Sequence, residues 1–289
     1  MQTKQNLIQT CLLCAFLLIA SSAPAQNLFE ADWSSGNIYE FTPGGARSTF
    51  ASGLSEPYGL AFNSAGDLFV ATWGGTIYEF TPGGAQSTFA SGLNGPIGLA
   101  FNGAGDLFVA NYDGKSITEI TPGGVESTFA SGLSGPEGLA FNSAGNLFES
   151  DQHGDNIIYE FTPGGGRSTF ASGLSGPCGL AFNSAGDLFE ADEISGNIYE
   201  FTPGGVKSTF ASGLDDPGGL AFNSAGDLFA TCVGNIYEFT PGGAQSTFAS
   251  GLNVPVDLAF QTVPEPSALE LLAVGATALF YRHRRNLAS

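Results

Sequence analysis

Side chains suited to proton transfer are scarce in the central part of this sequence. His153 is the one histidine between residues 26 and 262, and histidine is the side chain that most often transfers protons near neutral pH. Glu137 and Glu149 lie nearby in the chain, so catalysis would use His153 with one of these carboxylates. The alternative is that His153 is an exposed loop residue without a chemical role. The sequence has no serine nucleophile motif, phosphate-binding loop or zinc-ligand spacing.

Two positions of a repeated unit hold different side chains along the chain. One follows the proline of a Pro-x-Gly segment and is occupied by Tyr58, Ile97, Glu137, Cys178, Gly218 and Val256. The other is occupied by Trp33, Trp73, Tyr112, Gln152 with His153, Glu193 and Val233. Aromatic rings beside carboxylates suit a polar or sugar-like ligand, and drift at exposed loop positions is the alternative. The predicted ligand-binding residues are Trp33, Tyr58, Trp73, Tyr112, Glu137, Gln152, His153, Cys178 and Glu193.

Oxygen-bearing side chains recur at the end of one predicted strand, at Asp32, Asn111, Asp151 and Asp192. We expect them to cap the following turn, because a calcium ion needs several oxygen ligands that converge on one point. The segment 63–67, Asn-Ser-Ala-Gly-Asp, lacks the alternating acids of a calcium loop and predicts a tight turn. We therefore predict no metal site and no cofactor, with a bound divalent cation as the alternative.

The cysteines give little support for a disulfide. Cys11 and Cys14 lie in a predicted export signal, which leaves Cys178 and Cys232. These two are expected on adjacent units that diverge from a common axis, and a disulfide needs Cα atoms within about 7 Å. Both cysteines are therefore predicted to be free, and a disulfide between them stays an open alternative.

A repeat of about 40 residues must position these side chains. The segment Phe-Thr-Pro-Gly-Gly starts at residues 41, 80, 161, 201 and 239, and Ile120 opens one variant copy. Each unit divides into four short stretches, which we name a, b, c and d. In the second unit they cover residues 59–63, 68–72, 76–81 and 86–91. Four-stranded units at this period are typical of propeller blades, so the sequence predicts an all-β, six-bladed β-propeller.

The two ends of the repeat region predict a closed ring. The first unit begins at stretch b, near residues 27–32, and the last unit ends after stretch a, at residues 255–260. Pairing of these stretches would complete the first blade and remove an open sheet edge. Gly59 and Ala61 would keep the inner strand slim, while Phe50 and Phe62 would fill the space between sheets. The connections from d to a and from b to c emerge on one face, so the variable positions are expected around one mouth.

The repeat resembles the NHL-type propeller family. The resemblance lies in Pro-x-Gly-Leu-Ala-Phe-Asn-x-x-Gly-Asp-Leu-Phe-x-Ala-Asp, followed by Asn-Ile-Tyr-Glu-Phe, and spans residues 27–260. Residues 117–122 are also similar to repeats of streptogramin lyases and gluconolactonases. These resemblances imply a propeller, and they add a metal-dependent lyase or lactonase as an alternative function. Streptogramin lyases are generally seven-bladed, however, and these families share a scaffold rather than a reaction.

The first 25 residues predict an export signal. Lys4 lies in a polar start, an apolar run covers residues 11–20, and Ala23-Pro24-Ala25 forms a small-x-small cleavage site. The mature protein would begin at Gln26 and carry the predicted propeller over residues 26–262. We therefore expect an exported protein at the cell surface or outside the cell.

Residues 263–289 predict a sorting tail. Val263-Pro264-Glu265-Pro266 precedes an apolar stretch at residues 268–281 and the cluster Arg282-His283-Arg284-Arg285. This order resembles the PEP-CTERM sorting signal, which implies an exosortase as partner. The apolar stretch is shorter than the roughly 20 residues that span a bilayer, so we expect a transient inner-membrane anchor.

The predicted propeller is strongly acidic. After both end segments are set aside, 25 of the 27 acids and 4 of the 8 bases remain. Nucleic acid is an unsuitable partner, because contacts with phosphate need a basic face. The acidic charge is compatible with cations or with basic or neutral polymers as ligands, and a role in solubility alone is the alternative. Because catalytic side chains are scarce, the sequence favours a non-catalytic binding or structural module that recognises a glycan or a protein.

Overall fold

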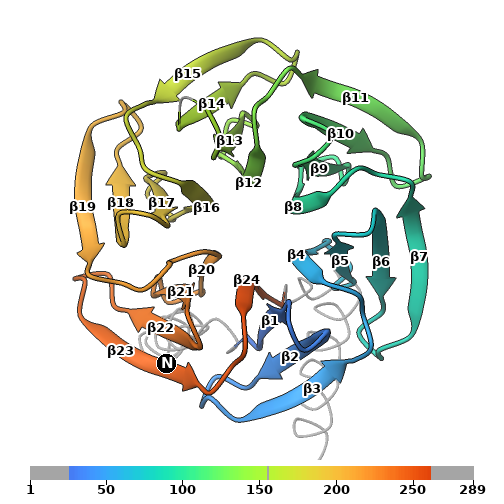
Figure 1. Cartoon of the computed structure of the whole chain (residues 1–289), viewed down its shortest axis with the longest axis horizontal. Helices are drawn as coiled ribbons and strands as arrows, with labels where there is room; N and C mark the ends of the chain where they lie inside the picture. The colour runs from blue at the N-terminus through green and yellow to red at the C-terminus, as the bar shows by residue number, and fades with distance from the viewer. Residues whose placement is uncertain (1–25, 155, 262–289) are drawn as a thin grey trace, which may run out of the picture.

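A computed structural model of the chain describes residues 26–154 and 156–261. In these residues all regular secondary structure is β-strand, arranged as six antiparallel four-stranded sheets around a central axis (Figure 1). The predicted all-β, six-bladed β-propeller is thereby confirmed. The described part contains no helix with the length and apolar character needed to cross a membrane. The predicted export signal and sorting tail lie outside the described residues.

Each blade runs from an inner strand a to an outer strand d. Blade 1 consists of β24 (Pro255–Phe260), β1 (Leu28–Asp32), β2 (Asn37–Phe41) and β3 (Arg47–Ala51). Blade 2 consists of β4 (Pro57–Phe62), β5 (Leu68–Thr72), β6 (Thr76–Phe80) and β7 (Gln86–Ser91). Blade 3 consists of β8 (Pro96–Phe101), β9 (Leu107–Asn111), β10 (Ser116–Ile120) and β11 (Glu126–Ser131).

The other three blades repeat this order. Blade 4 consists of β12 (Pro136–Phe141), β13 (Leu147–Asp151), β14 (Ile157–Phe161) and β15 (Arg167–Ala171). Blade 5 consists of β16 (Pro177–Phe182), β17 (Leu188–Asp192), β18 (Asn197–Phe201) and β19 (Lys207–Ser212). Blade 6 consists of β20 (Leu220–Phe222), β21 (Leu228–Cys232), β22 (Asn235–Phe239) and β23 (Gln245–Ser250).

The last strand closes the ring, as the sequence predicted. β24 pairs antiparallel with β1, with Leu28 opposite Phe260 and Glu30 opposite Leu258. The Gln261 N–H donates to the carbonyl of Asn27 at 2.9 Å. Blade 1 therefore joins both ends of the described chain in one sheet, and β24 supplies the inner strand that blade 1 would otherwise lack.

Phenylalanines fill the layers between blades. The ring of Phe29 lies edge-on to Phe50 and Phe62, with centroids 5.0 and 5.1 Å away. Edge-to-face pairs at this distance stabilise a core beyond the area they bury. The predicted packing of Phe50 and Phe62 between sheets is confirmed.

Glycine allows the inner strands to approach one another. A Cβ atom on Gly59 would lie 1.8 Å from the carbonyl oxygen of Ile97, and one on Gly98 would lie 1.9 Å from that of Glu137. No side chain fits at such a distance, so the ring cannot close this tightly with another residue there. The predicted slim inner strand is confirmed for Gly59.

The two faces of the disc differ in what they carry. The turns between strands a and b lie on one face, where Gly66 has a φ of 88°, as the predicted tight turn requires. Both ends of the described chain lie on this face, since Gln26 accepts a hydrogen bond from the Ser224 N–H and donates one to the Gln261 carbonyl. The connections that were predicted to form the mouth therefore lie on the opposite face.

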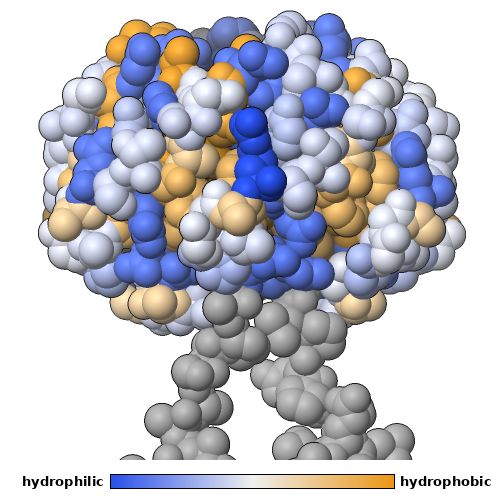
Figure 2. All heavy atoms as spheres, turned by 90° about the horizontal axis from the view of Figure 1, so that it is seen from below, coloured by the Kyte–Doolittle hydropathy of each residue, from blue (hydrophilic) through white to orange (hydrophobic). Residues whose placement is uncertain are grey.

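The outer wall of the disc is mixed in character. Figure 2 shows it edge-on, with hydrophilic and hydrophobic residues side by side. The first three residues of each outer strand are exposed, as in β3 and β7, whereas the following phenylalanine is partly buried. Exposed polar side chains on an edge strand oppose pairing with another sheet.

Candidate ligand-binding mouth

A cavity of about 400 Å³ opens at the axis of the disc on the face opposite to the chain ends. Its wall consists of the starts of the inner strands and the turns that follow strand b. Most of the predicted ligand-binding residues line it: Tyr58, Trp73, Tyr112, Glu137, Gln152, Cys178 and Glu193. The structure thus brings together on one surface side chains that come from four different blades.

Aromatic rings form one side of the mouth across blades 2, 3 and 4. Tyr58 lies 6.1 Å from Trp73, and Trp73 lies 5.7 Å from Tyr112, measured between ring centroids. Tyr112 lies 5.2 Å from the imidazole of His153, and its hydroxyl contacts the Nε2 atom of that ring. We call these four residues the aromatic arc. It offers flat apolar faces that end in polar groups.

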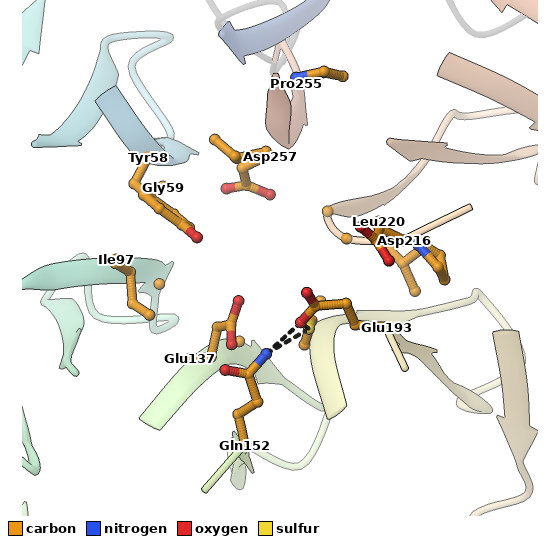
Figure 3. Close-up of a pocket in the computed structure, with 18 of the residues that line it drawn as sticks. Tyr58, Gly59, Ile97, Glu137, Gln152, Glu193, Asp216, Leu220, Pro255 and Asp257 are labelled. Carbon is orange, nitrogen blue, oxygen red and sulfur yellow. Dashed lines mark hydrogen bonds between the residues drawn. The ribbon is translucent and has the colours of Figure 1, made fainter. Parts of the chain in front are cut away.

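Carboxyl groups converge on the cavity from other directions. Figure 3 shows the side chains of Glu137 and Asp257 pointing toward each other across the opening, with the Tyr58 hydroxyl between them on one side. Burial and the nearby Glu193 raise the pKa of Glu137 to about 8. Burial raises the pKa of Asp257 to about 7, against the hydrogen bonds it accepts from backbone N–H groups. Burial in the cavity thus disfavours negative charge on both groups.

Gln152 connects the aromatic arc to the acidic side. Its amide nitrogen donates to the Oε2 atom of Glu193 at 2.6 Å and to the sulfur of Cys178 at 3.3 Å. Its amide oxygen accepts from the Tyr112 hydroxyl at 3.4 Å. These contacts fix the orientation of four polar side chains before any ligand binds, which lowers the entropy lost on binding.

The sequence analysis missed Asp257. Five inner strands carry glycine at this position of the repeat, whereas the sixth reads Pro255-Val256-Asp257. The Oδ2 atom of Asp257 accepts a hydrogen bond from the Leu60 N–H at 2.8 Å, so this side chain stands where blades 1 and 2 meet. The signal was present in the sequence, because a repeat position that excludes side chains in five copies holds a carboxylate in one.

Two predicted mouth residues lie outside the cavity wall. Trp33, on the turn after β1, is 36% exposed and does not line the cavity. His153 is exposed on the turn after β13 and reaches the site through Tyr112. A base at His153 would therefore act at the rim of the mouth rather than inside it.

Glu149 does not reach the mouth at all. It is fully buried in the middle of β13, and both of its carboxyl oxygens lack a hydrogen-bond partner. Its neighbour Leu147 packs against blade 3, and alternation along the strand turns Glu149 toward the same layer. Glu149 is therefore separated from His153, the base with which the sequence analysis grouped it.

Glu149 belongs to a set of three buried interblade glutamates, Glu30, Glu149 and Glu190. Burial and Asp32 raise the pKa of Glu30 to about 9, while Arg47 opposes this effect. A basic side chain on strand d lies over a strand c tyrosine in each of these blades: Arg47 over Tyr39, Arg167 over Tyr159 and Lys207 over Tyr199. Blades 2, 3 and 6 have valine or alanine in place of the glutamate and no base at that point of strand d.

The aspartates at the end of strand b do more than the predicted cap. Asp32 accepts from the Ser35 N–H at 2.9 Å in the following turn, as expected. Asp151 instead accepts from the Ser134 and Gly135 N–H groups, both at 2.8 Å, in the connection that leads into β12. These aspartates therefore also hold the segments that deliver the variable residues to the mouth.

Both cysteines of the described chain are free, and both line the cavity. Burial raises the pKa of the Cys232 thiol to about 12 and raises that of the Cys178 thiol as well. Because the thiolate is the reactive form, neither group is activated as a nucleophile.

No three His, Cys, Asp or Glu side chains in the described part of the chain are arranged to hold a metal ion. The carboxyls of the mouth point toward shared space without forming a compact ligand set. A divalent cation bound by these residues would require them to move closer together.

The fold and the cavity define a six-bladed β-propeller with an asymmetric central mouth. No family model and no curated protein matches the chain. Among solved structures it is similar to a chain of a nidogen/laminin complex, with 19% identity, a TM-score of 0.76, and coverage of 82% of this chain and 98% of that one.

Two enzymes have similar folds. A gluconolactonase from Xanthomonas campestris has 15% identity, a TM-score of 0.67, and coverage of 84% of this chain and 93% of that one. A virginiamycin B lyase from Staphylococcus aureus has 18% identity, a TM-score of 0.62, and coverage of 78% and 85%. At such low identities the similarity concerns the fold alone.

Proposed function

We propose that this protein is an exported, non-catalytic binding module that recognises a glycan at its mouth. The observation that carries the proposal is the cavity, whose wall differs from blade to blade while the rest of each blade is nearly repeated. The rings of Tyr58, Trp73 and Tyr112 offer faces on which sugar rings stack. Gln152 and the carboxyls supply hydrogen-bonding groups that orient a hydroxylated ligand.

Titration of the purified protein with a panel of neutral and amino-sugar oligosaccharides, including the trimer of N-acetylglucosamine, tests this proposal. We expect saturable binding that Trp73→Ala weakens by about tenfold or more, because a stacking face is lost. Trp33→Ala is the matched control, since Trp33 holds the same repeat position outside the cavity wall. Failure of every oligosaccharide to bind, or equal losses in the two variants, would contradict the proposal.

For the two ends of the chain, we propose that residues 1–25 direct export and that residues 263–289 are a sorting tail read by an exosortase. Gln26 and Gln261 lie on the face opposite to the mouth, so a tail that leaves from there would turn the mouth away from the membrane. Fractionation of cells tests this address. We expect the full chain at the cell surface and a chain that stops at residue 262 in the medium, and equal distributions would refute a sorting role.

A lyase or lactonase is the alternative function, and one observation favours it. Glu137 has a pKa of about 8 in the cavity, which suits a group that exchanges a proton near neutral pH. Assays with gluconolactone and with a streptogramin, each with and without added divalent ions, test this alternative. Turnover that disappears in Glu137→Gln would replace the binding proposal with an enzymatic one.

A further inference from the structure

The charges that line the mouth are all of one sign. Four of the lining residues are acids, namely Glu137, Glu193, Asp216 and Asp257, and no lysine, arginine or histidine lines the cavity. The described chain has bases elsewhere, such as Arg47 and Arg167 on the outer wall. The cavity thus disfavours an anion and favours a ligand that carries a positive charge.

Glu137 has an unused acceptor in this acidic cavity. Its Oε2 atom is buried and has no hydrogen-bond partner, which costs free energy unless a ligand supplies a donor. Asp257 faces Glu137 across the opening, and its carboxylate helps to raise the pKa of Glu137. A positive group between them would restore the ionised form of both carboxyls and satisfy the Oε2 atom.

An ammonium group fits this arrangement better than a divalent metal ion. A calcium ion needs six to eight oxygens within about 2.6 Å, whereas the described chain offers no set of three metal-binding side chains. An ammonium has three N–H donors and can bridge carboxyls that stand farther apart, through charge-assisted hydrogen bonds. The Tyr58 ring beside the opening can add a cation–π contact.

We propose that the ligand of the mouth is an amino-sugar oligomer whose primary ammonium sits between Glu137 and Asp257 while its sugar rings lie on the aromatic arc. This inference rests on the proposed glycan-binding function and specifies its ligand. The arc leads from Tyr58 at the cavity to His153 at the exposed rim, so a ligand longer than one ring can follow it outward. Glu137 and Asp257 then select which end of the oligosaccharide enters the cavity.

Two trimers with the same skeleton test the proposal, the trimer of glucosamine and the trimer of N-acetylglucosamine. Calorimetric titration should show the free-amine trimer binding about tenfold or more tighter. Glu137→Gln and Asp257→Asn should each remove most of this preference, so that each variant binds the two trimers with similar affinity. Asp257→Asn retains an oxygen acceptor for the Leu60 N–H, so it preserves the junction between blades.

Controls separate this inference from the wider proposal. Glu126→Gln removes one exposed charge on β11, away from the mouth, and should leave the preference intact. Equal affinity for the two trimers would overturn the ammonium site and leave glycan binding standing, whereas no binding of either would remove both. Nα-acetyl-lysine amide is the third probe. Tighter binding of this amine than of the glucosamine trimer would overturn the saccharide and point to a lysine side chain.

Discussion

The layers between blades are nearly identical around the ring, whereas the mouth differs from blade to blade. In each layer one buried phenylalanine lies edge-on to two others, with centroids 4.9 to 5.1 Å apart, from the pair of Phe29 and Phe50 to the pair of Phe229 and Phe260. At the mouth, the residue after the inner proline is different in all six blades. Packing in a ring imposes the same geometry on every layer, whereas the mouth faces solvent and can vary without loss of the fold.

A single methyl group on an inner strand should cause the largest loss of stability. Gly98→Ala would place a Cβ atom 1.9 Å from the Glu137 carbonyl oxygen, so the strands must separate. We expect a loss of about 2–3 kcal/mol in the free energy of unfolding, measured with denaturant. Gly103→Ala is the control, because a Cβ atom there meets nothing within 4 Å. Equal stability of the two variants would show that the inner ring is looser than described.

The interblade glutamates should make the stability of the layers depend on pH. The pKa of Glu30 is about 9 in the folded protein, well above its ordinary value, so between these values the folded state holds a proton that the unfolded chain has released. The contribution of Glu30 to stability is then most favourable below the ordinary pKa of glutamate and becomes less favourable as the pH rises toward 9. The melting temperature should follow this decline, and a flat profile would contradict it.

Replacement of Glu149 by valine should reduce this dependence of stability on pH, because it converts an interblade layer with a buried glutamate into one with valine. Valine occupies the same position in blades 2 and 3, as Val70 and Val109, where it is fully buried. We expect Glu149→Val to raise the free energy of unfolding by about 1–2 kcal/mol at about pH 8, since a buried carboxyl without partners is removed. Thermal melts across pH measure the effect. Exposed Glu126→Gln should leave the profile unchanged.

The smallest change in stability should come from Arg167, which lies on β15, the outer strand of blade 4. Arg167 lies 4.8 Å from the centre of the Tyr159 ring and lowers the pKa of Glu149, against burial. Arg167→Gln should change the free energy of unfolding at about pH 7 by less than about 0.5 kcal/mol, because Arg167 is exposed. It should also extend the loss of stability to higher pH, as the pKa of Glu149 in the folded protein rises further. A large loss at neutral pH would show that the base is essential to the layer.

Much of the mouth was predicted from positions that vary between repeats. Tyr58, Trp73 and Glu137 were found because each departs from an otherwise constant unit, and the cavity wall contains all three. Glu149 was grouped with His153 on closeness in sequence, yet the strand turns it into an interblade layer. Separation along the chain does not give the direction of a side chain when its position in the strand is ignored.

The sequence by itself determined the blade, the number of blades and the closure of the ring, because these follow from a repeated pattern and from the split between its first and last units. Only the tertiary structure decided which variable residues share a cavity, since that depends on how six sheets meet at the axis. It also gave Asp257 its place opposite Glu137, through a contact between strands about 200 residues apart in the chain. Side chains that meet only after ring closure leave no local signal of their pairing.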